Sequence, residues 1–397
     1  MSDDTDRPDE AHPEGESLPE DAPETVAVVG GGAIGTTAAF DLASAGVDVT
    51  LFEAGDIGGE STSSTGRAAG VVYDAFAEDI DADVADRALE RFRAFDGEGD
   101  FTFTPCPYVW LAREGDEKRA NAIREQVSRM QTNGRNVELA DFDALTEAYD
   151  DLVLSDVAVA AVAHDAGYVD PAAYPPLLAK KAEDAGATIR TETPVAVSTE
   201  PTGVVPKDVD GADIEQFDAV LVAAGAHTKR LLAGAGIAIA MKPYRVQALT
   251  ATDDRDVPMV YDATAGFYCR PHPTGLLAGD GTEEVEADPD DWNPDADDWF
   301  RADLDAGLAE RIGCEPSVER AWAGLCTATP DYDPLLGELR DGLYVATGFQ
   351  GHGFMRSPAL AEAVVADILG EGGLDPFDPT RFDGDEEFDI VEGMAVE

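Results

Sequence analysis

A glycine-rich turn near the start of the chain limits its possible folds more than any other feature. Residues 30–35 read GGGAIG, directly after the apolar run Thr25–Val29 and before a small-residue stretch that ends at Ala45. A second apolar run, Val47–Phe52, follows. A buried strand, a glycine turn, a helix and another strand in this order are typical of the doubly wound fold that binds dinucleotides. We therefore predict an α/β protein that begins with a Rossmann-like unit.

Each glycine of the turn has its own role in such a fold. Gly30 permits the tight turn, Gly32 lets the backbone approach a pyrophosphate, and Gly35 lets the helix pack close to the strand. The helix N-terminus offers free N–H groups to phosphates. Glu53, about 20 residues further on, can accept hydrogen bonds from ribose hydroxyls and disfavours NADP. The predicted contacts of this unit are Gly30, Gly32, Ala33, Ile34, Gly35, Glu53 and Ala54.

A loop rich in hydroxyl groups and small residues follows the second strand. It reads STSSTGRAAG over residues 61–70. Such a loop can lie along a long cofactor and bind it through the backbone, which favours FAD over NAD, although its composition also suits a surface linker. The contacts predicted here are Ser63, Thr65, Arg67, Ala68, Ala69 and Gly70.

The composition is strongly acidic, since 82 Asp and Glu against 27 Lys and Arg give a formal net charge of −55. This charge argues against nucleic acid and anionic membranes as partners, and the sequence contains no apolar run of about 18 residues that would predict a membrane span. Acidic residues spread along a lysine-poor chain suit a cytoplasm with molar salt, which screens self-repulsion. We expect a halophilic, cytoplasmic protein.

Both ends of the chain are acidic. Residues 1–23 lack the basic patch and apolar stretch of a secretory signal. We expect this arm and the tail 373–397 to be poorly ordered. We expect no metal site and no disulfide framework, because no CxxC spacing occurs among the four cysteines, Cys106, Cys269, Cys314 and Cys326.

Four blocks of the sequence resemble the FAD-dependent oxidoreductases of the D-amino-acid oxidase, glycine oxidase and sarcosine or dimethylglycine dehydrogenase family. They are residues 26–54, 64–72, 217–232 and 321–369. The first block occurs in many dinucleotide-binding folds, whereas the last, which contains LYVATGFQGHGFMRSPAL, is far more specific. Their order along the chain carries the resemblance, and it implies FAD as the cofactor.

The resemblance implies two interleaved domains. Strands expected at 246–252, 266–270 and 276–278 follow one another without helices and predict an antiparallel sheet outside the first domain. We expect a Rossmann-like FAD-binding domain interleaved with an antiparallel-sheet substrate domain. The FAD-binding domain is expected to comprise residues 24–75, 155–240 and 320–372, and the substrate domain residues 76–154 and 241–319.

The resemblance also implies where the flavin lies. In the family, the segment that matches residues 348–355 meets the flavin ring, and a helix, expected here from Ser357, points its N-terminus at the ring. Such a helix would stabilise negative charge on the reduced flavin. Val195 matches a backbone contact to adenine, and Ala224 and Gly225 match the pyrophosphate side. The implied contacts in the loop are Gly348, Gly351, His352, Gly353, Phe354 and Met355.

The chain departs from the family where relatives attach flavin or bind substrate. Arg67 and Gly324 stand where some members carry the His or Cys that bonds to flavin, which implies non-covalent FAD. Cys326 and Met355 replace an Arg and a Lys at the substrate end. Leu277 stands where sarcosine oxidases carry the Lys that activates oxygen, which favours a dehydrogenase with an unknown electron acceptor over an oxidase.

A carboxylate on the substrate would need a cation, and the candidates are Arg245, Arg270 and Arg356. Arg270 lies on a predicted strand with Tyr268 and His272, and the alternation of side chains places all three on one face. That face is either the substrate cavity or a solvated sheet surface. His352 is expected beside the flavin or bonded to its own loop. The catalytic candidates are Tyr268, Arg270, His272 and His352.

The expected function is oxidation of a small-molecule amine, namely a D-amino acid, glycine, sarcosine or dimethylglycine. Hydride would pass to the flavin, and the resulting imine would be hydrolysed. Two alternatives remain open at this point. One is a flavoprotein assembly factor without amine turnover, and the other is a dehydrogenase of 2-hydroxy acids.

Overall fold

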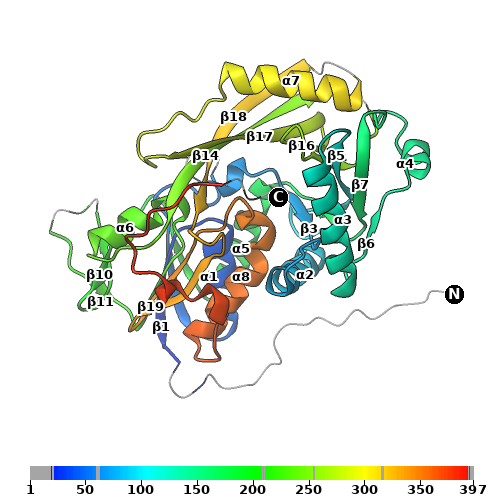
Figure 1. The fold of residues 1–397 in the computed structure, drawn as a ribbon. Helices are drawn as coiled ribbons and strands as arrows, with labels where there is room; N and C mark the ends of the chain where they lie inside the picture. Colours follow the sequence, from blue (N-terminus) through cyan, green and yellow to red (C-terminus); the bar gives the residue numbers. More distant parts are fainter. Residues whose placement is uncertain are drawn as a thin grey trace.

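Two large sheets, joined side by side, organise the molecule (Figure 1). The structure is a computed structural model. It describes residues 19, 22–59, 63–207, 209, 211–253, 255–313, 317–391 and 393.

The first sheet has six strands and confirms the predicted doubly wound unit. Its order is β19-β20-β13-β1-β2-β9, and all neighbours are parallel except the edge strand β19, which is antiparallel to β20. Strands covered on both faces are almost continuously apolar, as VAVV and AVLV show here. The strands are β1 (Thr25–Val29), β2 (Asp48–Phe52), β9 (Thr188–Arg190), β13 (Ala219–Val222), β19 (Leu335–Arg340) and β20 (Leu343–Thr347).

Helices cover one face of this sheet, and a small antiparallel sheet covers the other. The helices are α1 (Ala33–Ser44), α5 (Tyr174–Asp184) and α8 (Gly353–Ile368). Leu42 of α1 and Leu360 of α8 are fully buried in one core with the sheet. The opposite face is covered by α6 (Thr228–Gly234) and by the sheet β10 (Val195–Thr199), β11 (Thr202–Pro206) and β12 (Glu215–Gln216).

The second sheet has eight strands in the order β18-β14-β17-β16-β15-β5-β7-β6. It is antiparallel as predicted, except that β15 pairs parallel with β5. Its strands are β5 (Tyr108–Arg113), β6 (Val137–Leu139), β7 (Val157–Ala163), β14 (Lys242–Thr252), β15 (Met259–Asp262), β16 (Phe267–His272), β17 (Gly275–Glu286) and β18 (Ser317–Ala328). Figure 1 shows α7 (Asp298–Ile312) lying across its outer face.

The inner face of the second sheet packs toward the first domain. Helices α2 (Asp79–Ala94) and α3 (Glu117–Thr132) share a core with it, and α4 (Phe142–Ala148) lies beside β6 and β7 (Figure 1). A third small sheet consists of β3 (Val71–Tyr73), β8 (Ala166–Tyr168) and β4 (Thr104–Pro105). Because β3 directly follows the loop 63–70, this small sheet positions that loop between the domains.

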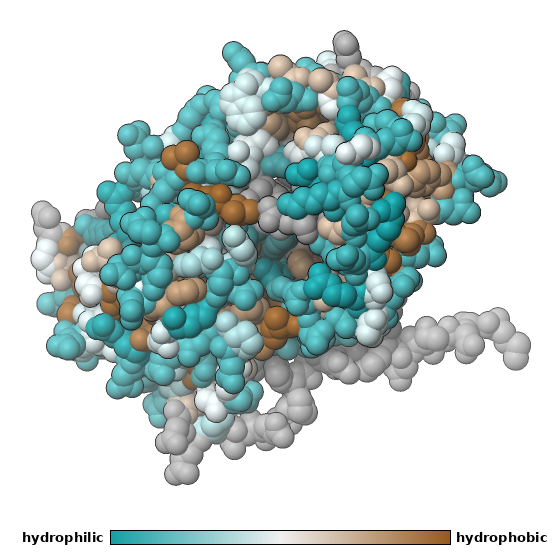
Figure 2. Space-filling model, viewed as in Figure 1, coloured by the Kyte–Doolittle hydropathy of each residue, from teal (hydrophilic) through white to brown (hydrophobic). Residues whose placement is uncertain are grey.

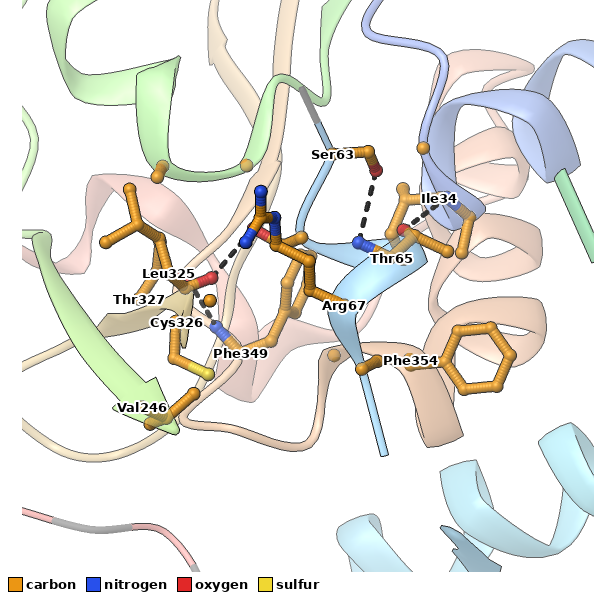
Figure 3. A pocket seen from close by; sticks show the side chains of 18 of the residues that line it. Ile34, Ser63, Thr65, Arg67, Val246, Leu325, Cys326, Thr327, Phe349 and Phe354 are labelled. Carbon is orange, nitrogen blue, oxygen red and sulfur yellow. Dashed lines mark hydrogen bonds between the residues drawn. The ribbon is translucent and has the colours of Figure 1, made fainter. Parts of the chain in front are cut away.

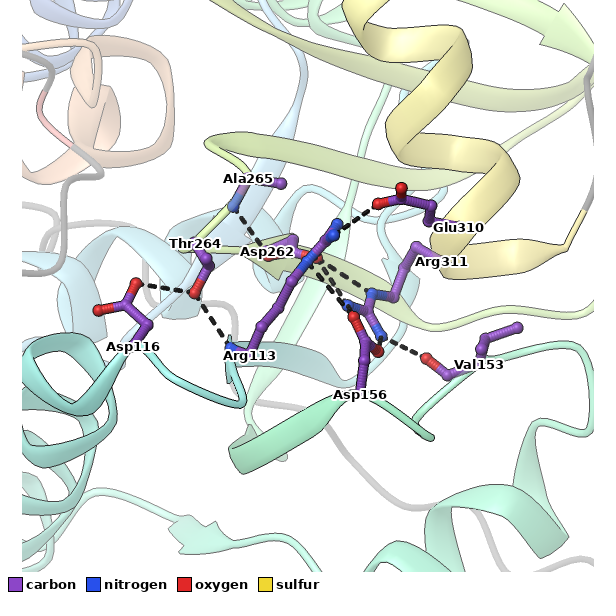
Figure 4. Close-up of polar contacts among 9 residues, drawn as sticks. All are labelled: Arg113, Asp116, Val153, Asp156, Asp262, Thr264, Ala265, Glu310 and Arg311. Carbon is purple, nitrogen blue, oxygen red and sulfur yellow. Dashed lines mark hydrogen bonds and ion pairs between the residues drawn. The ribbon is translucent and has the colours of Figure 1, made fainter.

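A buried ion network ties α7 to the eight-stranded sheet (Figure 4). The side chains of Arg311 and Asp262 are both fully buried, and Nη2 of Arg311 lies 2.8 Å from Oδ2 of Asp262. Arg113 also binds Asp262, and Asp156 binds Arg311 from the start of β7. The carboxylate of Asp262, which solvent does not reach, therefore joins its own strand β15 to β5 and to α7.

The domain boundaries differ from the expected ones. Strand β7 lies in the expected FAD segment 155–240, and most of β18 lies in the segment 320–372, yet both strands pair within the eight-stranded sheet. β7 pairs with β5 and β18 pairs with β14, and each pairing joins segments that lie far apart in the sequence, which local sequence does not encode.

The acidic tail also differs from the expectation, because its described part packs against the protein. Phe377 and Ile390 are buried, and Gln350 of the loop between β20 and α8 donates through Nε2 to the carbonyl of Val391. Arg381 forms an ion pair with Asp331. Two buried apolar side chains, one hydrogen bond and one ion pair thus hold a segment whose overall charge predicted disorder. The N-terminal arm lies almost wholly outside the described residues.

Hydrophilic side chains dominate the face of the molecule shown in Figure 2. Figure 2 shows that apolar residues appear on the visible face only as small separate patches. No helix among the described residues has the length and apolarity needed to cross a membrane.

Candidate active site

The glycine turn has the geometry that the sequence predicts. Gly30 has a φ of 117°, and its N–H donates to the carbonyl of Phe52 at 2.9 Å. A Cβ at Gly35 would lie 1.9 Å from the carbonyl oxygen of Gly30. Side chains are therefore excluded at both positions, and the first turn of α1 lies directly against the strand ends.

Glu53 directly follows β2 and lies beside this turn. Its carboxylate accepts from the N–H of Gly31 at 2.7 Å and from the N–H of Gly55 at 2.8 Å. The turn and the carboxylate thus form one unit, in which the acidic group is held by two backbone donors. Its predicted role as an acceptor for ribose hydroxyls stays a prediction.

A cavity of about 680 Å³ begins at this turn and extends to the face of the eight-stranded sheet. Figure 3 shows Ile34, Ser63 and Thr65 on one side and Leu325 and Cys326 on the other, with Arg67 between them. The predicted contacts that line the cavity are Gly30, Gly32, Ala33, Ile34, Glu53, Ala54, Ser63, Thr65, Arg67, Ala68, Ala69, Gly70, Val195, Ala224, Gly225, Gly351, His352, Gly353, Phe354 and Met355.

Two of the predicted contacts shape the wall without lining it. Gly35 packs against Gly30, as described above. Gly348 has a φ of 78°, and a Cβ there would lie 2.4 Å from Cγ2 of Thr329. Gly35 is required by close backbone packing, and Gly348 by its positive φ and the nearby side chain of Thr329, rather than by contact with a ligand.

The hydroxyl-rich loop is bound to both domains. Oγ1 of Thr65 accepts from the N–H of Ala33 at 3.1 Å, which places the loop over the N-terminus of α1. Arg67 donates through Nη1 to the carbonyl of Ala323 at 2.7 Å, and Trp322 donates through Nε1 to the carbonyl of Arg67 at 3.0 Å. These bonds show that the loop is an ordered part of the cavity and not a surface linker.

Helix α8 begins four residues before the predicted start at Ser357, with His352 as its N-cap. Pro358 lies inside the helix and cannot donate to the carbonyl four residues back. In the structure, Oγ of Ser357 donates to that carbonyl, of Phe354, at 2.8 Å. Gly353, Phe354 and Met355 therefore form the first turn, and the helix N-terminus faces the cavity.

His352 lines the cavity but is buried. Burial, together with the nearby Arg356, lowers the pKa of its imidazole to about 3. Its ring meets the edge of Phe76 at a centroid distance of 5.5 Å. The imidazole is thus neutral at physiological pH, and it presents a polar group to the cavity without a charge.

Of the three candidates on β16, only Tyr268 lines the cavity. Arg270 is buried behind the loop and donates through Nε to the carbonyl of Ala69 at 2.6 Å. His272 is half-buried at the end of the strand, where Nδ1 lies 3.0 Å from Oγ1 of Thr274. The expectation that all three face the cavity is corrected, because the loop 67–70 lies between the sheet and the cavity beyond Tyr268.

The other two candidate arginines are bound to carboxylates of the chain. Arg245 binds Glu283 and Asp297, and Arg356 binds Asp81 of α2. Both are buried. Neither is therefore placed to bind a substrate carboxylate.

Sequence analysis missed an aromatic and apolar part of the wall. Tyr108, Met259 and Trp322 line the cavity with Tyr268 and Met355. Met259 is directly opposite Tyr108 in the parallel β5–β15 pair. No local pattern indicates this pairing, since the two strands are far apart in the sequence.

No group of three or more metal-binding side chains occurs among the described residues. The described cysteines, Cys106, Cys269 and Cys326, are free thiols, and Cys314 lies outside the described residues. Cys326 lines the cavity.

The doubly wound fold and the cavity that begins at its glycine turn are typical of dinucleotide-binding oxidoreductases. The family model described as FAD dependent oxidoreductase, DAO, matches residues 25–367, and the chain belongs to this family. FAD is its cofactor. The glycine turn, the loop 63–70 and the N-terminus of α8 lie along one cavity and fit that cofactor.

Known relatives share the family at low identity. A 4-methylaminobutanoate oxidase (formaldehyde-forming) of Paenarthrobacter nicotinovorans is 26% identical over 90% of this chain, which spans only 45% of that protein. A glycine oxidase of Bacillus subtilis is 26% identical over 86% of this chain and 92% of its own length. Among solved structures, an L-proline dehydrogenase from P. horikoshii has a TM-score of 0.81 and 27% identity, and covers 91% of this chain and 98% of its own.

Proposed function

We propose that this protein oxidises an amino acid or an N-methylglycine-type amine at the end of the cavity formed by Tyr268 and His352. The relatives named above act, by their names, on amines and amino acids, which supports this substrate class. When bound, FAD supplies the oxidising step by accepting hydride from the carbon next to the amine.

The observation that carries the proposal is the position of the buried His352 on the cavity wall, at the N-terminus of α8 and in contact with Phe76. Hydride leaves readily only from an amine that is not protonated, and an uncharged imidazole can accept a hydrogen bond from its N–H. Burial holds the pKa of the His352 imidazole far below its ordinary value, so the imidazole carries no positive charge at neutral pH. The product imine is then hydrolysed by water to a carbonyl compound and an amine.

The aromatic wall orients the substrate and excludes water. Tyr108 and His352 line the cavity, and two rings behind the lining hold them in place. Tyr73 stacks on Tyr108 with ring centroids 4.5 Å apart, and Phe76 contacts both Tyr73 and His352. Such rings give a rigid surface against which the apolar part of a substrate can pack. The N-terminus of α8 adds positive potential on the same side.

The proposal is tested by anaerobic reduction of the purified protein in high salt. Sarcosine, dimethylglycine, glycine, proline, D-alanine and 2-hydroxy acids are added singly, and the visible absorption of flavin is followed. We expect at least one of them to bleach it. Bleaching only by 2-hydroxy acids would support the hydroxy-acid alternative, and no bleaching by any compound, with FAD retained, would support a role without amine turnover.

A further inference from the structure

Arg270 is a buried cation that is held by carbonyl groups. Its side chain donates to the carbonyls of Ala69 at 2.6 Å and Pro271 at 2.7 Å, and the guanidinium lies 4.9 Å from the centre of the Tyr168 ring. The residue is 3% exposed. Within the described part of the chain, no carboxylate forms an ion pair with it. Because a buried charge without a counter-charge is costly, this arrangement needs an explanation.

The carbonyl that Arg270 binds belongs to the wall of the FAD cavity. Ala69 and Gly70 both line the cavity. Gly70 has a φ of 70°, and its carbonyl accepts from the N–H of Val169 at 2.9 Å. A Cβ at Gly70 would lie 2.3 Å from the carbonyl oxygen of Val169. Arg270 and Val169 therefore hold two successive peptide groups from the side away from the cavity.

The orientation of the Ala69–Gly70 peptide follows from these bonds. In a trans peptide, the carbonyl oxygen and the N–H point in opposite directions. Since the oxygen of Ala69 points to Arg270, the N–H of Gly70 points toward the cavity. It has no acceptor among the described residues, although Gly70 is buried. A buried N–H normally has a partner, so this donor is directed at a ligand.

We propose that Arg270 positions the N–H of Gly70 as a hydrogen-bond donor to the flavin and stabilises negative charge on the reduced flavin through the same peptide. The guanidinium polarises the carbonyl of Ala69, which strengthens the donor on the other side of the peptide. Arg270 is thus a positioning residue that touches neither flavin nor substrate. This role rests on FAD in the cavity and does not depend on the substrate.

The charge of Arg270 persists at working pH. Burial lowers the pKa of its guanidinium to about 10, which leaves the group protonated at neutral pH. Tyr268, Tyr168 and Asp170 act in the opposite direction and keep the pKa from falling further. The uncompensated cation is therefore present in both redox states of the flavin.

The midpoint potential of the flavin tests the role, since it is measured by chemical reduction against a reference dye without any substrate. For Arg270→Met, we expect reduction to be about tenfold less favourable, equivalent to about 30 mV for a two-electron couple. Arg270→Lys keeps the charge and should restore part of the potential. Arg340→Met removes one positive charge at an exposed site and should leave the potential unchanged.

The outcomes separate this role from the alternatives. An unchanged potential in a folded, FAD-loaded Arg270→Met protein would overturn the proposal. A rise in KM for carboxylate substrates alone, without a change in potential, would instead make Arg270 a substrate anchor. If Arg270→Met fails to fold, Arg270→Lys and Arg270→Gln provide the same comparison. Failure of every amine to reduce the flavin would refute the proposed function and leave the potential measurement valid.

Discussion

His352 combines a position on the cavity wall with a strongly lowered pKa. The imidazole is removed from water by the first turn of α8 and by Phe76, and the guanidinium of Arg356 repels a proton from it. Arg356 itself is held by Asp81, so its position does not depend on the charge of His352. The same burial that keeps the His352 imidazole uncharged in the cavity wall therefore also makes the stability of the fold depend on pH.

We predict that His352 makes the protein sensitive to acid. The folded pKa is about 3 and the ordinary value is 6.5, so the unfolded state binds more protons between these values. The stabilisation is complete above pH 6.5 and is lost as pH falls, by up to about 1.4 kcal/mol per pH unit. Denaturant unfolding at pH 7 and pH 5 should show a smaller loss for His352→Gln than for the unchanged protein. An equal loss in both would contradict the assignment.

At the scale of elements, the turn between β1 and α1 depends on close backbone packing. We predict that Gly35→Ala weakens FAD binding about 10- to 100-fold, because its Cβ would overlap the carbonyl of Gly30 and overpacking costs about 1–3 kcal/mol. Gly234→Ala in α6 is the matched control, since no atom lies within 4 Å of the Cβ position there. Fluorescence titration of the apoprotein with FAD measures both. Equal affinities would contradict the role of the turn.

The network between α7 and β15 gives a second prediction at this scale. Asp262→Asn leaves the fully buried Arg311 without its closest carboxylate, and we expect a loss of about 3–5 kcal/mol in the free energy of unfolding. Arg87→Met is the control, because Arg87 is half-exposed and its ion pairs are worth about 1 kcal/mol or less. Guanidinium chloride unfolding compares the two. A loss below 1 kcal/mol for Asp262→Asn would show that the network does not hold α7.

The cofactor end of the site was predictable, and the substrate end was not. The turn 30–35, Glu53 and the loop 63–70 are contiguous segments whose local patterns specify their geometry. Tyr108 and Met259 meet only through a pairing between distant strands. Arg270 shares the face of Tyr268 as alternation predicts, but the loop 67–70 separates it from the cavity. Which residues line a cavity depends on such tertiary contacts.

At the scale of the whole molecule, the net charge of −55 sets the conditions for stability. Repulsion among the carboxylates opposes the compact state, and salt screens it. We predict that raising KCl from 0.1 M to 3 M increases the Tm by at least about 5 °C. Differential scanning calorimetry with FAD in excess measures this, and sorbitol at matched water activity is the control. A Tm independent of salt would contradict the halophilic interpretation.

We expect the cavity between the two sheets to hold FAD without a covalent bond. This binding mode is tested most directly by precipitating the protein purified in high salt with acid and analysing the supernatant by chromatography. We predict one equivalent of FAD per chain in the supernatant and a colourless pellet, with loss of the flavin in Gly35→Ala. A yellow pellet would contradict non-covalent binding, and a protein that neither contains nor takes up FAD would contradict the account as a whole.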